Sequence, residues 1–168
     1  MQSERRERHV RQYRRLGWGE WCAACVFVYV TAFSLDDGLA SLDATAAVWW
    51  ALMPLLAVLV QAGAYWLAAR SWVGVSSMPR LAALAVLMLR PLNVIALIAA
   101  AVGIAVTWPS SNAGAILAVA IWLFAVAEFA NYFVIRLAYR PRDVLRGIAT
   151  RRTPRLMLDA RQSPEAAL

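Results

Sequence analysis

The sequence predicts an all-α membrane protein: four transmembrane helices in a compact bundle, with both termini cytoplasmic. Three observations predict this fold. The chain has 168 residues and is 62% hydrophobic, and its apolar residues form four long blocks. Each block is about long enough to cross the ~30 Å hydrocarbon core as a helix at 1.5 Å per residue. The third observation is the placement of the basic residues. Threading the blocks alternately through a membrane puts every arginine on one side.

The spans predicted from these blocks are about 18–35, 44–69, 92–108 and 113–135. All seventeen basic side chains are arginines, and none lies in the connections 36–43 and 109–112. The first of these connections holds three aspartates instead. By the positive-inside rule, both termini are then cytoplasmic and the protein is a multi-pass protein of the cell inner membrane. Arginine without lysine, together with abundant alanine, is typical of a bacterial genome rich in GC.

Size and charge exclude several other classes of protein. With 168 residues there is room for one bundle and no separate soluble domain. The net charge of +7 is concentrated beside the spans, where attraction to anionic lipid headgroups explains it. We therefore expect the lipid bilayer as a partner and no nucleic acid.

The first half of the chain reads as a basic cytoplasmic arm, a first span and a short outer connection. The arm covers residues 1–17 and is expected to be amphipathic or disordered. Asp36-Asp37-Gly38 predicts a turn, and Asp43 is the expected N-cap of the second span. Pro54 removes one hydrogen bond from that span and is expected to bend it.

The second half is less regular in pattern. We expect an interfacial cytoplasmic segment over 70–91 and a chain break at Arg90–Pro91, because a residue before proline is disfavoured in the α region. The alternative is one long helix over 79–108. The membrane domain, 18–139, is expected to end with a helix that continues through Arg140. A basic tail over 140–168 then serves as a topology signal and binds lipid.

Polar side chains recur at one depth in the cytoplasmic halves of the spans. Counting at 1.5 Å per residue puts Glu20, Gln61, Asn93 and Glu128 in one layer. Glu128, Asn131 and Tyr132 follow i, i+3, i+4 spacing and share one face of the fourth span. A carboxylate inside a span costs roughly 2.5 to 3.5 kcal/mol on insertion scales, so we expect Glu128 to have a function or a partner.

The leading functional hypothesis is a small enzyme that acts by acid catalysis on a hydrophobic, isoprenoid-like substrate. Glu128 is the expected general acid. The other expected catalytic residues orient it or tune its charge, and they are Asn131, Tyr132, Asn93, Arg90 and Glu20. The expected substrate cavity is lined mainly by aromatic side chains, which can stabilise a cation, and comprises Gln61, Tyr65, Trp66, Trp122 and Phe129. Membrane-bound meroterpenoid cyclases use the same chemistry, although no sequence motif links this chain to them.

Two alternatives stay open at this point. In the first, the polar layer only holds helices together and the protein is a non-catalytic membrane subunit that binds a partner protein. In the second, it is an oligomeric proton-coupled exporter, and a homo-oligomer is compatible with either alternative.

Metal, redox and cofactor chemistry lack the residues they need. Cys22 and Cys25 resemble the redox pair of quinone-linked disulfide oxidoreductases, but those enzymes need a second pair and this chain has two cysteines. His9 is the single histidine, so no motif has metal-ligand spacing. We expect no cofactor and no bound metal.

The predicted topology can be measured with reporter fusions. Fusions at Gly38 and Ser110 should report the external side, because the connections that contain them carry no arginine. A fusion at Leu168 should report the cytoplasm. An external signal from Leu168 would show that the four-span prediction is wrong.

Overall fold

The computed structural model describes residues 2–73, 75–135 and 154–161, and all secondary structure within them is helical. In chain order the elements are α1 (Gln2–Tyr29), the π-helical turn η1 (Val30–Ser34), α2 (Asp36–Ser41), α3 (Thr45–Trp72), α4 (Arg80–Val106), α5 (Asn112–Phe133) and α7 (Arg155–Arg161). Four of these helices are long and apolar enough to cross a membrane: α1, α3, α4 and α5. The expected all-α architecture with four long apolar helices is therefore confirmed.

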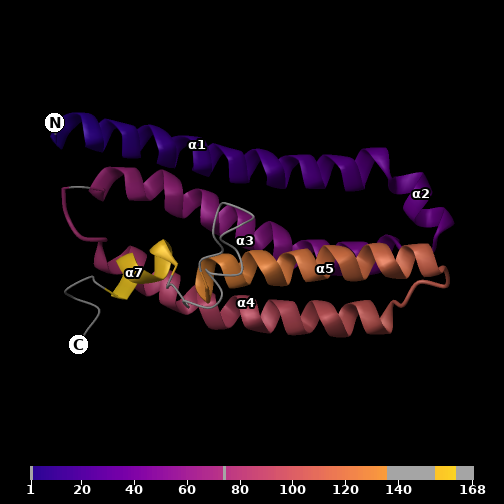
Figure 1. Cartoon of the computed structure of the whole chain (residues 1–168). Coiled ribbons are helices and arrows are strands. Elements are labelled where there is room, and N and C mark those ends of the chain that lie inside the picture. Colours follow the sequence, from indigo (N-terminus) through magenta and orange to yellow (C-terminus); the bar gives the residue numbers. More distant parts are fainter. Residues whose placement is uncertain (1, 74, 136–153, 162–168) are drawn as a thin grey trace.

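The long helices lie side by side (Figure 1), and the residues at the two ends of the bundle differ in charge. The start of α1, the α3–α4 connection and α7 lie at one end, which we call the arginine end because Arg6, Arg70 and Arg80 belong to it. The short helix α2 and the α4–α5 connection lie at the opposite end, the α2 end, together with Asp43. The separation of charge along the sequence thus becomes a separation in space.

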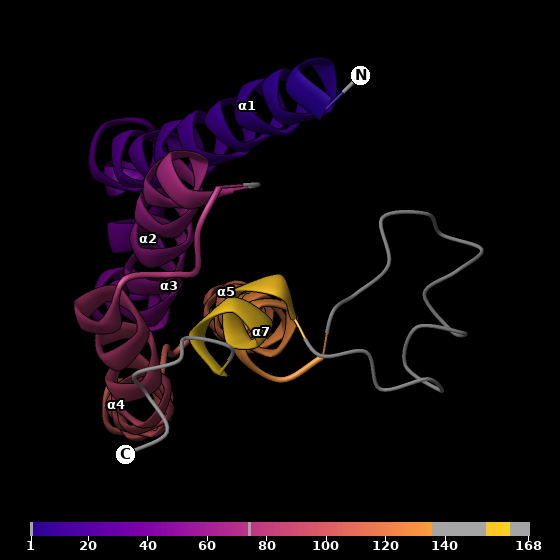
Figure 2. The ribbon, with the colours of Figure 1, turned by 90° about the vertical axis from the view of Figure 1, so that its left-hand side faces the viewer.

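Helix α3 is the centre of the bundle, since α1, α4 and α5 all pack against it (Figure 2). Its side chains Leu52, Leu55 and Val58 are completely buried. Buried residues cover most of the circumference of the helix, and the exposed stripe that remains is apolar, with Met53 and Val60 in it. Gln61 is the exception among the apolar side chains in its middle.

Close helix contacts form where glycine faces tryptophan. A Cβ atom on Gly63 of α3 would stand 2.3 Å from Cδ1 of Trp21 and 3.0 Å from the carbonyl oxygen of Gly17. Trp21 also donates its indole N–H to the carbonyl oxygen of Val60 at 3.2 Å. At the α3–α4 contact, a Cβ atom on Gly103 would lie 2.3 Å from the ring of Trp50. Glycine thus lets bulky rings lie against a neighbouring backbone.

The basic arm is the helical continuation of the first span. Tyr13 is buried, and its ring lies 5.0 Å from that of Trp66 in an edge-on arrangement. Arg8, Arg11 and Arg15 are exposed. Of the two expectations for the arm, the described part from Gln2 onward agrees with the amphipathic helix.

The connection at the α2 end differs from the expected turn. Asp36, Asp37 and Gly38 begin helix α2 instead. Asp43 does not cap α3, whose N-cap position is Ala44 with no side-chain hydrogen bond. Asp43 has φ 52°, because the chain reverses there: its N–H bonds to the oxygen of Ala40 at 3.0 Å, and the N–H of Ala44 bonds to that of Leu39 at 2.9 Å. This pair of bonds is the Schellman ending of a helix, which needs a left-handed residue.

The expected break at Arg90–Pro91 is wrong, because α4 is one helix from Arg80 to Val106. Proline removes a single backbone donor, whereas a break would expose several polar groups to apolar surroundings. Pro91 itself is exposed, and the next buried residues, Asn93 and Leu97, attach the helix to the bundle. The helix therefore passes position 91 without interruption, as in the alternative of one long helix over 79–108.

Helix α5 ends at Phe133, earlier than expected. The N–H groups of Val134 and Ile135 both bond to the oxygen of Ala130, at 2.9 and 2.8 Å, which closes the last turn. The predicted continuation through Arg140 is thus not found at Val134 and Ile135, and residues 136–153 lie outside the described residues. Part of the expected tail, α7, packs on α4 and α5 through Leu156 and Met157.

The contact between Gly63 and Trp21 predicts a sharp difference between two glycine variants. Gly63→Ala should destabilise the protein by about 1 to 3 kcal/mol, because the added methyl group overlaps an indole ring and a backbone oxygen. Gly19 lies on α1, two residues before Trp21, and no atom stands within 4 Å of the Cβ that Gly19→Ala adds. That change should be neutral or stabilising by about 0.5 to 1 kcal/mol. Thermal unfolding of the purified variants in detergent measures both effects. Equal melting temperatures would contradict the contact.

Candidate functional site

Two carboxyl groups meet at the contact between α1 and α5. Tyr132 of α5 donates its phenol O–H to Oε1 of Glu20 on α1. Glu128, one helical turn before Tyr132, is close enough to Glu20 for the two negative charges to repel. Both carboxyl side chains are half-buried, whereas Tyr132 is buried. We call Glu20, Glu128 and Tyr132 the acid site.

The sequence of α5 places the rest of this site. Asn131 lies within hydrogen-bonding reach of the carboxyl of Glu128 on the same face of the helix. Phe129 and Phe133 stack with their ring centroids 5.4 Å apart, and both are buried. Burial of these rings turns one side of α5 toward the core, and the bond from Tyr132 to Glu20 shows that an adjacent side faces α1.

Trp66 brings α3 to the same site. Its indole N–H lies near the phenol oxygen of Tyr132 but makes no hydrogen bond with the described residues. The indole is 8% exposed, and a buried donor without a partner costs about 1 to 3 kcal/mol. Among the described residues, Trp66 therefore holds an unused donor beside Tyr132.

No arginine neutralises the acid site within the described residues. Neither Glu20 nor Glu128 forms an ion pair there. Arg90, the expected partner, is half-buried on α4 and makes no such contact. Arg136, the other candidate considered for pairing, lies outside the described residues.

Asn93 pairs with Gln61 and not with Glu128. The two amides bond reciprocally between α3 and α4, with Nδ2 of Asn93 donating to Oε1 of Gln61 at 2.6 Å and Nε2 of Gln61 donating to Oδ1 of Asn93 at 3.1 Å. Asn93 is 2% exposed. This pair therefore joins two helices, and it turns the side-chain amide of Asn93 toward Gln61 and not toward the carboxyl of Glu128.

The remaining residues of the expected cavity are distributed over other contacts. Tyr65 donates to Oδ2 of Asp159 on α7 at 2.8 Å. Trp122 donates to the carbonyl oxygen of Leu97 at 3.0 Å and so ties α5 to α4. Of the five residues expected in the cavity, Trp66 is the one whose contact with the acid site is direct.

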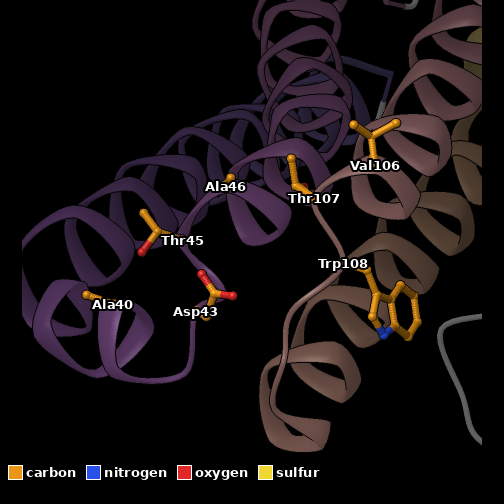
Figure 3. Close-up of a pocket in the computed structure, with 7 residues that line it drawn as sticks. All are labelled: Ala40, Asp43, Thr45, Ala46, Val106, Thr107 and Trp108. Atoms are coloured by element: carbon orange, nitrogen blue, oxygen red, sulfur yellow. The ribbon is translucent and has the colours of Figure 1, made fainter.

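A pocket of about 560 Å³ lies at the α2 end (Figure 3). It is formed where the start of α3 faces the end of α4, and its lining includes Asp43, Thr45, Val106, Thr107 and Trp108. Asp43 is the one charged side chain in that lining. None of the residues expected in the catalytic site or the substrate cavity lines this pocket.

Within the described residues, no set of three or more His, Cys, Asp or Glu side chains comes together to hold a metal. Cys22 and Cys25 are both free and exposed on α1.

Sequence reasoning missed the contribution of Asp159. The signal was present, since Asp159 follows Leu156-Met157-Leu158 within a basic tail, and an apolar group followed by an acid differs from the residues around it. An apolar group of this kind indicates a segment that packs rather than one that only carries charge.

Comparisons with protein families, with curated proteins and with solved structures gave no match to this chain. The chemistry of the site therefore has to be argued from its own residues.

The reciprocal amide pair predicts a double-mutant cycle. Gln61→Leu and Asn93→Leu should each destabilise the protein by about 1 to 2 kcal/mol, because each leaves the other amide buried and unpaired. The double variant should lose less than the sum of the two, with a coupling energy of roughly 0.6 to 1.7 kcal/mol. Thermal unfolding in detergent gives the four values. Strictly additive losses would contradict the pair.

Proposed function

We propose that this protein is a membrane-embedded acid–base enzyme whose substrate is a hydrophobic, isoprenoid-like molecule that enters from the lipid. The observation that carries the proposal is the meeting of Glu20 and Glu128 without an arginine partner among the described residues. Ionisable groups within a membrane span are costly and commonly mark a site of proton transfer. A purely structural contact would be better served by amides, as Gln61 and Asn93 illustrate.

The roles of the two carboxyl groups follow from their partners. Tyr132 donates to Glu20, so Glu20 is the negative acceptor, and Glu128 is the group that holds the transferable proton. Asn131 positions Glu128. The unused N–H of Trp66 is a donor for an oxygen atom of the substrate.

The proposed reaction is an isomerisation, and its atoms balance without a cofactor. Glu128 protonates an alkene, whose π electrons form the new C–H bond, or an epoxide oxygen, whose lone pair takes the proton before the C–O bond breaks toward oxygen. Either step leaves a cationic carbon, which a neighbouring alkene attacks to close a ring. Loss of a proton to the carboxylate of Glu128 forms the new double bond and restores the acid. Trp66 and Tyr132 bring two aromatic rings to the site, and in the proposed reaction their quadrupoles stabilise positive charge.

The proposed setting is the cell inner membrane, with the arginine end toward the cytoplasm. Clustering of the described arginines at one end of the bundle supports this orientation, since positive residues are retained on the cytoplasmic side. The acid site then lies in the cytoplasmic half of the membrane.

A non-catalytic membrane subunit is the second candidate. Three polar contacts that only join helices favour it. They are the amide pair and the two indole–carbonyl bonds of Trp21 and Trp122. In that function, Glu20 and Tyr132 would also act only as a link between α1 and α5.

Replacing the acid by an amide separates the two functions. Glu128→Gln keeps the shape and most of the hydrogen bonding but has no proton to donate, so turnover should fall by at least about 10²-fold. The measurement is the conversion of a polyprenyl epoxide to products of unchanged mass by protein in liposomes, followed by chromatography and mass spectrometry. Glu7→Gln, which changes an exposed acid on the arm, should leave conversion unchanged.

Two results would contradict the proposal. Similar conversion by Glu128→Gln and by the unaltered protein would remove Glu128 from catalysis and favour the subunit. No conversion by the unaltered protein would remove the substrate class. Thermal unfolding of each variant checks that lost conversion is not lost folding.

A further inference from the structure

The pocket at the α2 end carries a negative charge that the described residues do not neutralise. Asp43 is the one charged side chain in its lining. Among the described residues, the carboxylate of Asp43 forms no hydrogen bond and no ion pair. In Figure 3, Asp43 lies on the side of the pocket where the chain passes from α2 to α3, and Thr107 and Trp108 lie on the side formed by the end of α4. A cation in the pocket would therefore be the counterion of Asp43.

Within the described residues, the arginines are far from this pocket. The sequence has no arginine between Arg15 and Arg70. It also has none between Arg90 and Arg136. Arg90 precedes Val106, which lines the pocket, by sixteen residues, and this is about 24 Å along α4. Because physiological salt screens exposed charges beyond about 8 Å, the countercharge has to come from outside the described chain.

The ends of two helices meet at the pocket, and their partial charges offset each other. Thr45 and Ala46 belong to the first turn of α3, whose N-terminus carries about +0.5 elementary charge. Val106 ends α4, and that C-terminus carries about −0.5 elementary charge. The carboxylate of Asp43 adds a full negative charge. The pocket is therefore negative by about one charge, which disfavours an anion and favours a monovalent cation.

The size and the walls of the pocket favour an organic cation over a metal ion. Calcium and magnesium ions take about six or more oxygen ligands at roughly 2.0 to 2.6 Å, and the lining offers one carboxylate. Its volume of about 560 Å³ is in the range of sites for small organic molecules, which is roughly 300 to 1,000 Å³. Ala40, Ala46 and Val106 give the lining apolar groups that can contact carbon atoms. An ammonium group on a short alkyl chain matches both the charge and the walls.

We propose that this pocket binds an alkylammonium group, with Asp43 as its counterion and the carbonyl groups at the end of α4 as further acceptors. Ammonium N–H groups donate to the carboxylate, and charge-assisted bonds of this kind are about twice as strong as neutral ones. The last carbonyl groups of a helix have no partner within the helix, so they can accept from the same ligand. No residue of the acid site lines the pocket, so this proposal is independent of the proposed function.

Two sources present this chemistry at the α2 end. In the proposed membrane orientation, that end lies at the external surface of the membrane. There the headgroup of phosphatidylethanolamine carries a primary ammonium group, and a soluble amine in the external medium carries the same group. Ethylammonium is the part that the two have in common, so it is the probe for the pocket.

Fluorine NMR of the full chain measures occupancy of the pocket. The protein is labelled with 5-fluorotryptophan in an uncharged maltoside detergent, and each signal is assigned by its absence in a Trp→Phe variant. Ethylammonium chloride should shift the signal of Trp108 in a saturable way, because Trp108 lines the pocket. The signal of Trp18, which is exposed on α1 outside the lining, should not move. Propanol, a neutral molecule of similar shape, and sodium chloride at equal ionic strength should not shift Trp108.

Asp43→Asn removes the charge and keeps the backbone. Asparagine adopts φ 52° as readily as aspartate, so the ending of α2 should be preserved. Binding of ethylammonium should weaken by at least about tenfold, because the ligand loses its charged partner. Asp43→Gly, which also suits a positive φ, is a second neutral variant and should weaken binding by a similar factor. Asp37→Asn removes the same charge from an exposed position of α2 outside the lining and should leave binding unchanged.

Three results would overturn the proposal. The first is the absence of a saturable shift of Trp108 with ethylammonium. The second is an equal shift with propanol, since the charge would then be irrelevant. The third is equal binding by the unaltered protein and by Asp43→Asn. Thermal unfolding of each variant in the same detergent verifies that weakened binding is not lost folding.

Nanodiscs of two compositions distinguish the two sources. In phosphatidylglycerol nanodiscs, ethylammonium should shift Trp108 as it does in detergent. If nanodiscs that contain phosphatidylethanolamine abolish this response, with Trp108 already at its bound position, the lipid headgroup occupies the pocket. An unchanged response there identifies a soluble amine as the ligand. Loss of the response in both kinds of nanodisc would overturn the proposal for the protein in a membrane.

Discussion

The architecture depends on the burial of α3 between three other helices. One helix can have three long neighbours only if it presents no polar face to them, and α3 satisfies this with apolar buried residues over most of its circumference. Its one exposed stripe, which includes Met53 and Val60, is apolar as well. Glycine at position 63 brings its backbone close to that of α1, and Trp50 lies against Gly103 of α4. The other three helices then need only one packed side each. Their remaining sides are apolar and exposed, as Ile95 and Ile98 of α4 illustrate.

Polar groups in such a bundle are confined to the contacts between helices. Gln61 of α3 faces the buried amide of Asn93 on α4, and the two amides bond to each other. Glu20 and Glu128 meet where two outer helices approach each other beside α3, and there a carboxyl group is half-buried. The acid site differs from the amide pair in this respect: the amides satisfy each other, whereas two carboxyl groups do not.

Much of the fold could be predicted from the sequence, because the amino acids of a segment alone determine whether it is apolar enough to form a long buried or membrane-spanning helix. The four long helices and the separation of arginine from aspartate follow from it. Local rules were less reliable where the environment opposed them. Proline at position 91 would end a helix in water, but apolar surroundings make a broken backbone more costly. Asp43 is a common capping residue, but the reversal after α2 requires a left-handed residue there and leaves the N-cap position to Ala44.

The candidate site could be predicted only in part, for a geometric reason. Counting residues gives the depth of a side chain along its helix, which placed Glu20, Gln61, Asn93 and Glu128 in one layer. It does not give the rotation of each helix or the order of the helices round the bundle. Asn93 was therefore expected beside Glu128, although α4 turns it toward Gln61. The contact of Tyr65 with Asp159 joins residues 94 positions apart, and the apolar group before Asp159 indicates only that the segment packs, not where it packs.

The continuity of α1 has a mechanical consequence. The helix is a rod that passes from the arginine-rich arm to Glu20, and between them its backbone comes close to that of α3 at Gly17 and Gly63. Tyr13 packs on Trp66 before that contact, and Trp21 packs on Gly63 beyond Glu20. The arm and the segment that carries Glu20 are therefore held against α3 as one rigid helix, with Glu20 about 4.5 Å along the axis from Gly17. A partner that displaced the arm would have to move this whole helix, Glu20 included.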